Sequence, residues 1–578
     1  MRLAGICSRG RASRRSKSKK MTLSKNERLG ALVSNGYFPA ELPPPFHTED
    51  LARFRVSLAA RWSQHATPKT VHLEPFSIPR TGTQRRQLSI VNPVPQLRLS
   101  QIIAENWISI RSHLNKSKYA IKRLEILKQE RAIEIPDFNL VNLRRHDIMS
   151  RYDHVIFSDT SRFYSTIYTH AIPWALHTKK WCKDHLPRPR IALYNASLGA
   201  KLDTAIRLCQ ENQSIGIPIG PDTSRILSEI IASAVDCLFE EATRFPAVQA
   251  FRNVDDWMIG FDSSESSGTI ISKLAAALRH FELEIHPEKT KVDATSNVPS
   301  NLWPSEVRKF AINEIKTPDK SNLVHFIEQC ISLSHQFPQE NVLNFSVKIS
   351  SNFKISKGNW PLYESFLLRC CRTNTTTIPV VCKLLSEYHA RQYDINRSKL
   401  QKLVADIIVR SAPYSYHFEV AWSLFLAKAL NIVIPNDAAR YLGEIESSVC
   451  ALLALDCQAS GLIPNGLNTS KWRKALTGDG LYSRMWLLAY EADKKNWLKG
   501  QSPRFVEQDK FFSELKQKNI SFYDPNRTVR LVKTRKWSAK AASIENFLKM
   551  MHEDERFSAD DDPSSLDAHL TGYGDFRF

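Results

Sequence analysis

The sequence lacks the cysteine spacing and the long apolar runs typical of zinc-binding, disulfide-stapled or membrane proteins. Its ten cysteines include no C-x2-C pair, and only Cys370 and Cys371 are neighbours. This pattern predicts free thiols in a reducing compartment. No stretch of about 18 uninterrupted apolar residues is present, so the sequence predicts no membrane span. We therefore expect a cytoplasmic protein.

Acidic side chains are in short supply as well. The 578 residues include 59 Asp and Glu against 80 Lys and Arg, a formal net charge of +21. A surplus of this size favours polyanions, because cationic side chains that neutralise phosphates release counterions. Nucleic acid is therefore the first partner expected.

Part of that surplus lies in residues 1–20, which hold eight of the Lys and Arg residues and no acid, so that the remainder carries +13. We interpret 1–20 as a basic disordered extension or a mis-assigned start, with Met21 as the alternative to Met1. A dedicated nucleic-acid arm is the other reading.

Length and hydrophobic patterning divide the rest. The length predicts three to four folding units. We expect an N-terminal region over 21–150, a strand-containing centre over 151–310, a helical domain over 311–556 and a flexible acidic tail over 557–578. The overall prediction is an α+β fold.

Several elements are expected within these regions. Phe76–Ile78 and Leu88–Val91 are predicted to pair as a hairpin with basic residues at its tip, and Val155–Ser158 is predicted as a buried strand. Val254–Phe261 reads as an apolar run interrupted by acids, and Asp222–Cys237 has helical spacing. From about Ser321 onward amphipathic helices follow one another with no fixed period, so a strict solenoid is not predicted.

Three aspartates stand out against their surroundings. Asp255 and Asp256 lie inside the apolar string R-N-V-D-D-W-M-I-G-F, and Asp159 follows the strand Val155–Ser158. Burying carboxylates is costly unless cations compensate them. If the two strands are neighbours, the three acids converge into a set of hard oxygen ligands suited to Mg²⁺. A lone D-D pair is more often a turn. The metal-site interpretation therefore depends on the order of the other motifs along the chain.

The order of motifs resembles the fingers and palm of reverse transcriptases. A basic hairpin is followed by D-T-S-R-F-Y, G-I-P-I-G-P-D-T-S, V-D-D-W and H-P-E-K-T-K. The chain is most similar to bacterial defence-associated, abortive-infection reverse transcriptases, through G-Y-F-P-A-E-L-P-P-P-F (36–46), S-D-T-S-R-F-Y-S-T-I-Y-T-H (158–170) and G-I-P-I-G-P-D-T-S-R (216–225). The resemblance covers about residues 30–310 and, more loosely, the helical half. It implies reverse-transcriptase fingers within 21–150 and a palm with the polymerase active site over 151–310. An irregular helical-repeat-like thumb or C-terminal domain would follow over 311–556.

The resemblance also implies roles for individual residues. Asp159, Asp255 and Asp256 match the carboxylates that hold two Mg²⁺ ions, and Asp256 also matches a palm organiser. Tyr164 matches the aromatic that excludes a ribose 2′-oxygen. The residues that match contacts of the incoming dNTP are Arg80, Arg86 and Gly220. Lys289 matches a general acid for pyrophosphate, with Lys291 as the alternative. The alternatives are core packing for Tyr164, solvated charge for the arginines and the lysine, and a plain helix entry for Gly220.

By this resemblance the chain is a magnesium-dependent RNA-directed DNA polymerase, a nucleotidyltransferase of antiviral defence. Its implied partners are dNTPs and RNA or single-stranded DNA, with a non-coding RNA or further copies of the chain left open and no membrane. Two departures, Ile219 for the common glutamine and Asn253 for the common aromatic, keep template-free or protein-primed synthesis as an alternative. An inactive nucleic-acid-binding scaffold is the third.

Two further patterns have more ordinary explanations. Arg410 and His417 are spaced loosely like a ribonuclease R-x6-H pair, but Pro413 lies between them, and a structural role is expected. Core packing is also expected for the tryptophans of the helical half, Trp422, Trp472, Trp486 and Trp497.

Overall fold

The computed structural model describes residues 23–529, apart from 69, 81–83, 135–137, 244–248, 263–265, 299–302, 314–316 and 501–502. The sequence expectations for 1–20 and 557–578 lie outside these residues. The described part mixes helices with two small sheets, so the predicted α+β class is confirmed. No helix among the described residues is both long and apolar enough to cross a membrane.

The N-terminal region combines helices with one two-stranded sheet. Its elements are α1 (Lys25–Ser34), α2 (Glu49–Trp62), β1 (Glu74–Pro79), β2 (Arg85–Ile90), α3 (Pro93–Glu105), α4 (Trp107–Leu114) and α5 (Phe138–Met149). The predicted hairpin is confirmed: β1 and β2 pair antiparallel, with Phe76 opposite Leu88.

The central region holds the second sheet. Its elements are β3 (His154–Asp159), α6 (Phe163–Thr166), α7 (Ala171–His177), α8 (Lys179–His185), α9 (Ile191–Ala196), α10 (Leu198–Leu208), α11 (Asp222–Thr243), β4 (Gln249–Asn253), β5 (Asp256–Phe261), α12 (Ser267–His280), η1 (Pro287–Lys289), β6 (Lys291–Ala294) and η2 (Thr295–Asn297).

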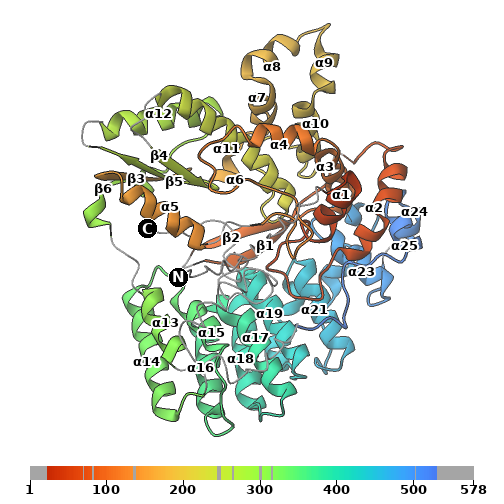
Figure 1. Ribbon diagram of the computed structural model, residues 1–578. Coiled ribbons are helices and arrows are strands. Elements are labelled where there is room, and N and C mark those ends of the chain that lie inside the picture. Colours follow the sequence, from red (N-terminus) through yellow and green to blue (C-terminus); the bar gives the residue numbers. More distant parts are fainter. Residues whose placement is uncertain are drawn as a thin grey trace, which may run out of the picture.

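The four strands of this sheet run antiparallel in the order β4-β5-β3-β6. Helices cover both faces, α5 on one and α11 with α12 on the other (Figure 1). Strand alternation explains this, because Val155 and Phe157 pack with α5 while Ile156 joins the core that includes α11. The predicted run Val254–Phe261 differs in one respect: Val254 and Asp255 form the turn that joins β5 to β4, a strand that was not predicted.

The remaining described chain is helical. It comprises α13 (Trp303–Asn313), α14 (Lys320–Gln336), α15 (Val342–Ser350), α16 (Trp360–Thr373), η3 (Thr375–Thr377), α17 (Ile378–Ala390), α18 (Arg397–Ser411), η4 (Ala412–Tyr414), α19 (His417–Ala429), α20 (Asn436–Ala439), η5 (Leu442–Glu444), α21 (Ser448–Ala459), α22 (Ser470–Arg473), η6 (Asp479–Tyr482), α23 (Trp486–Lys494), α24 (Phe505–Gln508) and α25 (Phe512–Gln517). Helices therefore begin at Trp303, earlier than the predicted Ser321. Trp422, Trp472 and Trp486 are buried, as expected, and Trp497 is half-buried.

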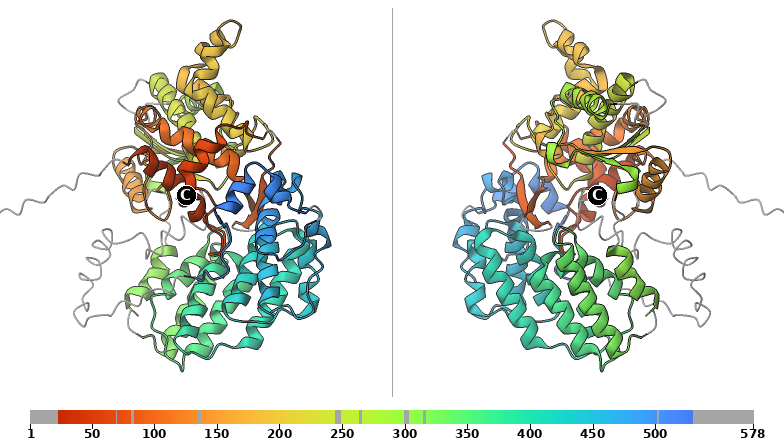
Figure 2. Two further views of the ribbon diagram at one scale, coloured as in Figure 1. Left: turned by 90° about the vertical axis from the view of Figure 1, so that its right-hand side faces the viewer. Right: turned by 90° about the vertical axis from the view of Figure 1, so that its left-hand side faces the viewer.

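The helical half packs directly against the N-terminal region (Figures 1 and 2). The backbone N–H of His47 donates to the Phe522 carbonyl at 3.0 Å, and that of Asp524 donates to the Pro45 carbonyl at 2.8 Å. The indole of Trp422 donates to the Glu41 carbonyl at 2.9 Å. Residues 41–47 are thereby held by segments that lie almost 400 residues or more further along the chain.

The hairpin β1–β2 is held by α19. Arg85 forms a bidentate ion pair with Glu419, both distances being 2.8 Å, and its guanidinium lies 3.8 Å from the centre of the Tyr416 ring. The backbone N–H of Ser77 donates to Nδ1 of buried His417 at 3.2 Å. Arg410 is exposed and donates to the Asp406 carbonyl of its own helix. The structural role expected for His417 is thus confirmed.

We expect His417 to make the protein sensitive to mild acid. Burial, aided by the neighbouring Arg85 cation, lowers the pKa of His417 from 6.5 to about 4. Between these pH values the unfolded chain binds the proton that the folded chain excludes, so stability is full above pH 6.5 and is lost as the pH falls. The expected loss at pH 5 is about 2 kcal/mol. Denaturant unfolding at pH 7 and pH 5 measures it.

The matched variant is His417→Asn, whose side-chain oxygen can replace Nδ1 as the acceptor for Ser77 but does not titrate. We expect its unfolding free energy to fall less between pH 7 and pH 5 than that of the parent. An equal fall in both proteins would contradict this assignment.

Candidate active site

Antiparallel pairing brings the predicted aspartates to one end of the sheet. Asp159 is the last residue of β3, and its partner in the register is Asp256, the first residue of β5. Asp255 precedes it in the turn, where its carbonyl accepts a hydrogen bond from the Thr160 N–H at 3.3 Å. The two acidic motifs, far apart in the sequence, therefore meet as the resemblance required.

At this end of the sheet two predicted carboxylates repel each other, and two predicted cations act against that repulsion. Burial and the nearby Asp159 carboxylate raise the pKa of Asp255 to about 7, while the Arg86 and Lys289 cations act in the opposite direction. The Lys289 ammonium forms an ion pair with Oδ2 of Asp159. Asp159, Asp255, Arg86 and Lys289 consequently belong to one electrostatic site.

This site has the donor chemistry for a divalent cation. Oδ1 of Asp159 is buried and has no hydrogen-bond partner among the described residues. A cation between Asp159 and Asp255 would satisfy that oxygen and relieve the repulsion that raises the pKa of Asp255. Mg²⁺ is commonly held by one or two carboxylates together with substrate phosphates. Within the described residues no group of three or more His, Cys, Asp or Glu side chains is arranged to hold a metal by itself.

A strained turn presents Asp255. Val254 has φ +58°, in the left-handed region that β-branched residues rarely adopt. Backbone strain of this kind persists only where surrounding contacts impose it. Here Nη1 of Arg252 donates to the Val254 carbonyl at 2.6 Å, and the same guanidinium is bound by Asp236 and Glu229 of α11. The long helix α11 therefore fixes the turn through Arg252.

Arg252 was not among the predicted site residues. Its position directly before N-V-D-D, in an otherwise apolar run, was the available sign that a buried cation supports the turn. The acids that bind it lie on α11, which predicts as an ordinary amphipathic helix, so their pairing with Arg252 requires the tertiary structure.

Tyr164 is hydrogen-bonded to the turn Gly216–Pro221 through its backbone. Its side chain is buried, and its hydroxyl lies 3.2 Å from Oγ of Ser228 on α11. Its backbone carbonyl accepts from the Ile217 N–H at 2.9 Å. The aromatic motif after Asp159 is thus joined to both the glycine-containing turn and the helix that follows it.

The strings G-Y-F-P-A-E-L and G-I-P-I-G-P-D also contact each other. The Gly36 carbonyl accepts from the Asp222 N–H at 2.7 Å, and Arg131 donates to the carbonyls of Phe38 and Gly220 while it pairs with the Asp222 carboxylate. The Ile219 carbonyl accepts from Ser89 of β2 at 2.8 Å. The turn is therefore attached to the hairpin as well as to the sheet region.

Only glycine fits at position 220, where the turn packs closely against Pro39. Gly220 has φ +127°, and a Cβ there would lie 2.7 Å from Cγ of Pro39. Sequence reasoning expected Gly220 to permit close approach to substrate; the approach that the structure displays is to Pro39.

We expect Gly220→Ala to lower the free energy of unfolding by about 3 kcal/mol, from backbone strain and overpacking together. Gly461→Ala is the matched control, because Gly461 also has a positive φ (+76°) but no heavy atom within 4 Å of the added Cβ. We expect the control to cost about 1 kcal/mol, from backbone strain alone. Equal losses in denaturant unfolding would show that the Pro39 contact is unimportant.

Strand alternation separates the hairpin arginines. Arg86 pairs with Ile78 across the hairpin and acts electrostatically on Asp255, whereas Arg85 points to Glu419 of the helical half. Arg80 follows β1 and closes the hairpin through its N–H to the Gln84 carbonyl at 3.0 Å. The structure thus separates Arg86 from Arg85, and it places Arg80 at the end of the hairpin that carries both.

The motif H-P-E-K-T runs beside β3. The His286 N–H donates to the Asp159 carbonyl at 2.8 Å, and Thr290 Oγ1 lies 3.0 Å from Ser158 Oγ. These contacts bring Lys289 of η1 to Asp159, whereas Lys291 is exposed at the start of β6, where it pairs with Phe157. Of the two candidate lysines, Lys289 is therefore the one at the carboxylates.

No protein-family model matches the chain, and no curated protein matches it by sequence.

Proposed function

We propose that the chain is a magnesium-dependent nucleotidyltransferase of the reverse-transcriptase type, which makes DNA from dNTPs on an RNA template in bacterial antiviral defence. The observation that carries the proposal is the register that sets Asp159 opposite Asp256 and beside Asp255, with Lys289 paired to Asp159. The defence role is taken from the resemblance alone.

In the proposed reaction a primer 3′-oxygen attacks the α-phosphorus of a dNTP, forming a new phosphodiester bond as the bond to pyrophosphate breaks. Asp159 and Asp255, with Asp256 beside them, would hold Mg²⁺, which when bound supplies Lewis-acid activation of the hydroxyl and stabilises the leaving oxygen. Arg86 and Arg80 would bind the triphosphate, since guanidinium groups recognise phosphate through paired hydrogen bonds.

Lys289 would have two roles. Before substrate binds, its ammonium neutralises Asp159. Its side chain is 41% exposed, so it can turn toward the leaving group, where it would donate a proton to pyrophosphate. This movement would transfer the positive charge from the carboxylates to the phosphates as the products form.

Tyr164 would select deoxyribose, because a buried ring beneath the sugar leaves no space for a 2′-hydroxyl. We expect Tyr164→Val to raise kcat/KM for UTP relative to dTTP at least tenfold. Tyr164→Phe keeps the ring and removes the hydroxyl that contacts Ser228, so its selectivity should stay within about threefold of the parent. Similar ratios for valine and phenylalanine would remove Tyr164 from substrate selection.

The activity is tested by supplying purified protein, with its co-purifying nucleic acid, with Mg²⁺ and labelled dNTPs singly and together, before and after RNase or protease treatment. Product that needs all four nucleotides and is lost after RNase pretreatment supports templated synthesis. Product made from one nucleotide and shifted by protease supports protein-primed, template-free synthesis, which the apolar Ile219 keeps as the second candidate. Absence of product from folded protein supplied with its native partners would favour the inactive scaffold.

A further inference from the structure

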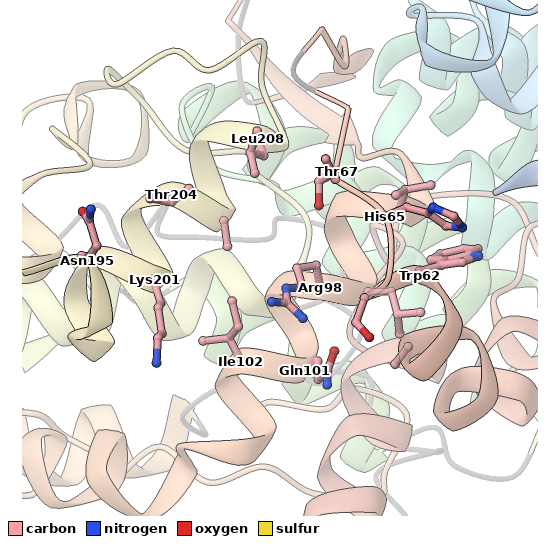
Figure 3. A pocket seen from close by; sticks show the side chains of 17 residues that line it. Trp62, His65, Thr67, Arg98, Gln101, Ile102, Asn195, Lys201, Thr204 and Leu208 are labelled. Atoms are coloured by element: carbon pink, nitrogen blue, oxygen red, sulfur yellow. The ribbon is translucent and has the colours of Figure 1, made fainter. Parts of the chain in front are cut away.

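A cavity of about 570 Å³ lies between the end of α2, the helix α3 and the helices α9 and α10 (Figure 3). Its volume is within the range of about 300–1,000 Å³ that is usual for small-molecule sites. None of the residues that line it belongs to the carboxylate site. In Figure 1 these helices lie on the right of α11, while the four-stranded sheet lies on the left.

The charge of this cavity has one sign. Arg98 of α3 and Lys201 of α10 contribute cations from two facing helices, and no acidic residue is among the described residues that line it. Neither cation forms an ion pair within the described part of the chain, and both are exposed. Two acids adjoin this wall: Glu105 accepts from the Gln101 amide at 2.8 Å, and Asp203 of α10 is paired with His170 and Arg207. The positive charge of the cavity therefore favours binding of an anion.

The rest of the wall is apolar or neutral. Apolar surface comes from residues such as Leu97, Ile102 and Leu208, while Asn195 and Thr204 add neutral hydrogen-bonding groups. A metal ion would find no carboxylate here, and a wholly apolar ligand would leave both cations unpaired. An inorganic anion alone would leave the apolar wall in water. The wall therefore matches a ligand with both an anionic group and an organic body.

We propose that this cavity is a second ligand site that binds a nucleoside monophosphate, apart from the polymerase chemistry proposed above. Arg98 and Lys201 bind the phosphate, because charge-assisted hydrogen bonds from guanidinium and ammonium groups are the strong contacts available. The sugar and base lie against Ile102 and Leu208, with Asn195 and Thr204 as polar contacts. Binding at this position joins the α2–α3 segment to α9–α10.

The test is equilibrium dialysis of the full chain with radiolabelled AMP in EDTA, which removes the divalent ions required by the carboxylate site. We expect saturable binding with one site per chain. Arg98→Gln and Lys201→Gln should each raise Kd at least tenfold, and Thr204→Trp, which fills the cavity from an exposed position, should abolish binding while both cations remain. Lys180→Gln on α8 removes the same charge outside the cavity and should leave Kd within about twofold.

Two further probes test the organic body. Adenosine, which lacks the phosphate, and ribose 5-phosphate, which lacks the base, should each bind at least tenfold more weakly than AMP. The proposal is overturned by no saturable AMP binding up to about 5 mM, by equal losses in Lys180→Gln and Arg98→Gln, or by equal affinity for ribose 5-phosphate and AMP. None of these outcomes depends on polymerase activity, so failure here and failure of the proposed function are distinguishable.

Discussion

Replacing Asp255 and Asp256 together by asparagine is expected to reduce nucleotide incorporation at least a thousandfold. Removing a single preorganised electrostatic group from an active site commonly costs about 10²–10³ in rate, and this change removes two anionic ligands. Incorporation of labelled dNTPs by protein purified in parallel measures the effect. Asp262→Asn, which removes a carboxylate just beyond the other end of β5, is the matched control and should retain activity.

Removing the Asp255 carboxylate is expected to increase stability although it reduces activity. The pKa of Asp255 is raised from 3.8 to about 7, so the ionised carboxylate is held at a cost whose upper limit is about 4 kcal/mol, from about three pKa units at 1.36 kcal/mol each. Because the side chain is only half-buried, we expect Asp255→Asn alone to raise the unfolding free energy by about 1–2 kcal/mol at pH 7.5. Denaturant unfolding without divalent ions measures it.

Loss of activity with a gain in stability indicates a group retained for function rather than for folding. Full activity in the double variant would overturn the proposed mechanism. A loss of both activity and stability would instead give the two aspartates a structural role.

Local patterns were sufficient for the elements around the site. The hairpin β1–β2, the strand β3 and the helix α11 were each predicted from apolar spacing, and their bounds differ from the structure by a few residues, except that α11 continues to Thr243. The β4–β5 turn was not predicted, because Val254 in an apolar run reads as strand while the structure holds it at φ +58°. That conformation is imposed by a tertiary contact from Arg252, which no local pattern contains.

The pairing of basic side chains with acids could not be predicted without the fold. Arg85 and Arg86 are adjacent and equally basic in the sequence, yet one pairs with Glu419 and the other acts on Asp255. The assignment requires the position of α19, which lies more than 300 residues further along the chain. The cavity between α3 and α10 could not be predicted for the same reason, because Arg98 and Lys201 share no motif.

Arg252→Met is expected to destabilise the protein by about 3–5 kcal/mol. Arg252 is buried, its guanidinium forms two 2.8 Å hydrogen bonds with Asp236, and it pairs with Glu229 at 2.6 Å. Removing the cation leaves the Asp236 carboxylate buried without its main compensation, which is the costly way to break a buried ion pair. Arg53→Met, at a side chain 72% exposed, should change stability by less than about 0.5 kcal/mol.

A second variant separates lost charge balance from lost packing. Arg252→Met/Asp236→Met removes both fully buried members of the ionic group and leaves Glu229, whose side chain is 14% exposed. We expect it to recover at least half of the stability lost in Arg252→Met, since apolar replacement of a buried pair is often neutral. Activity should not recover with stability, because the Val254 carbonyl would still lack the Arg252 donor that fixes the turn bearing Asp255. If activity returned together with stability, Arg252 would serve only folding; if activity stayed lost in the stable double variant, Arg252 is a positioning residue for the carboxylates.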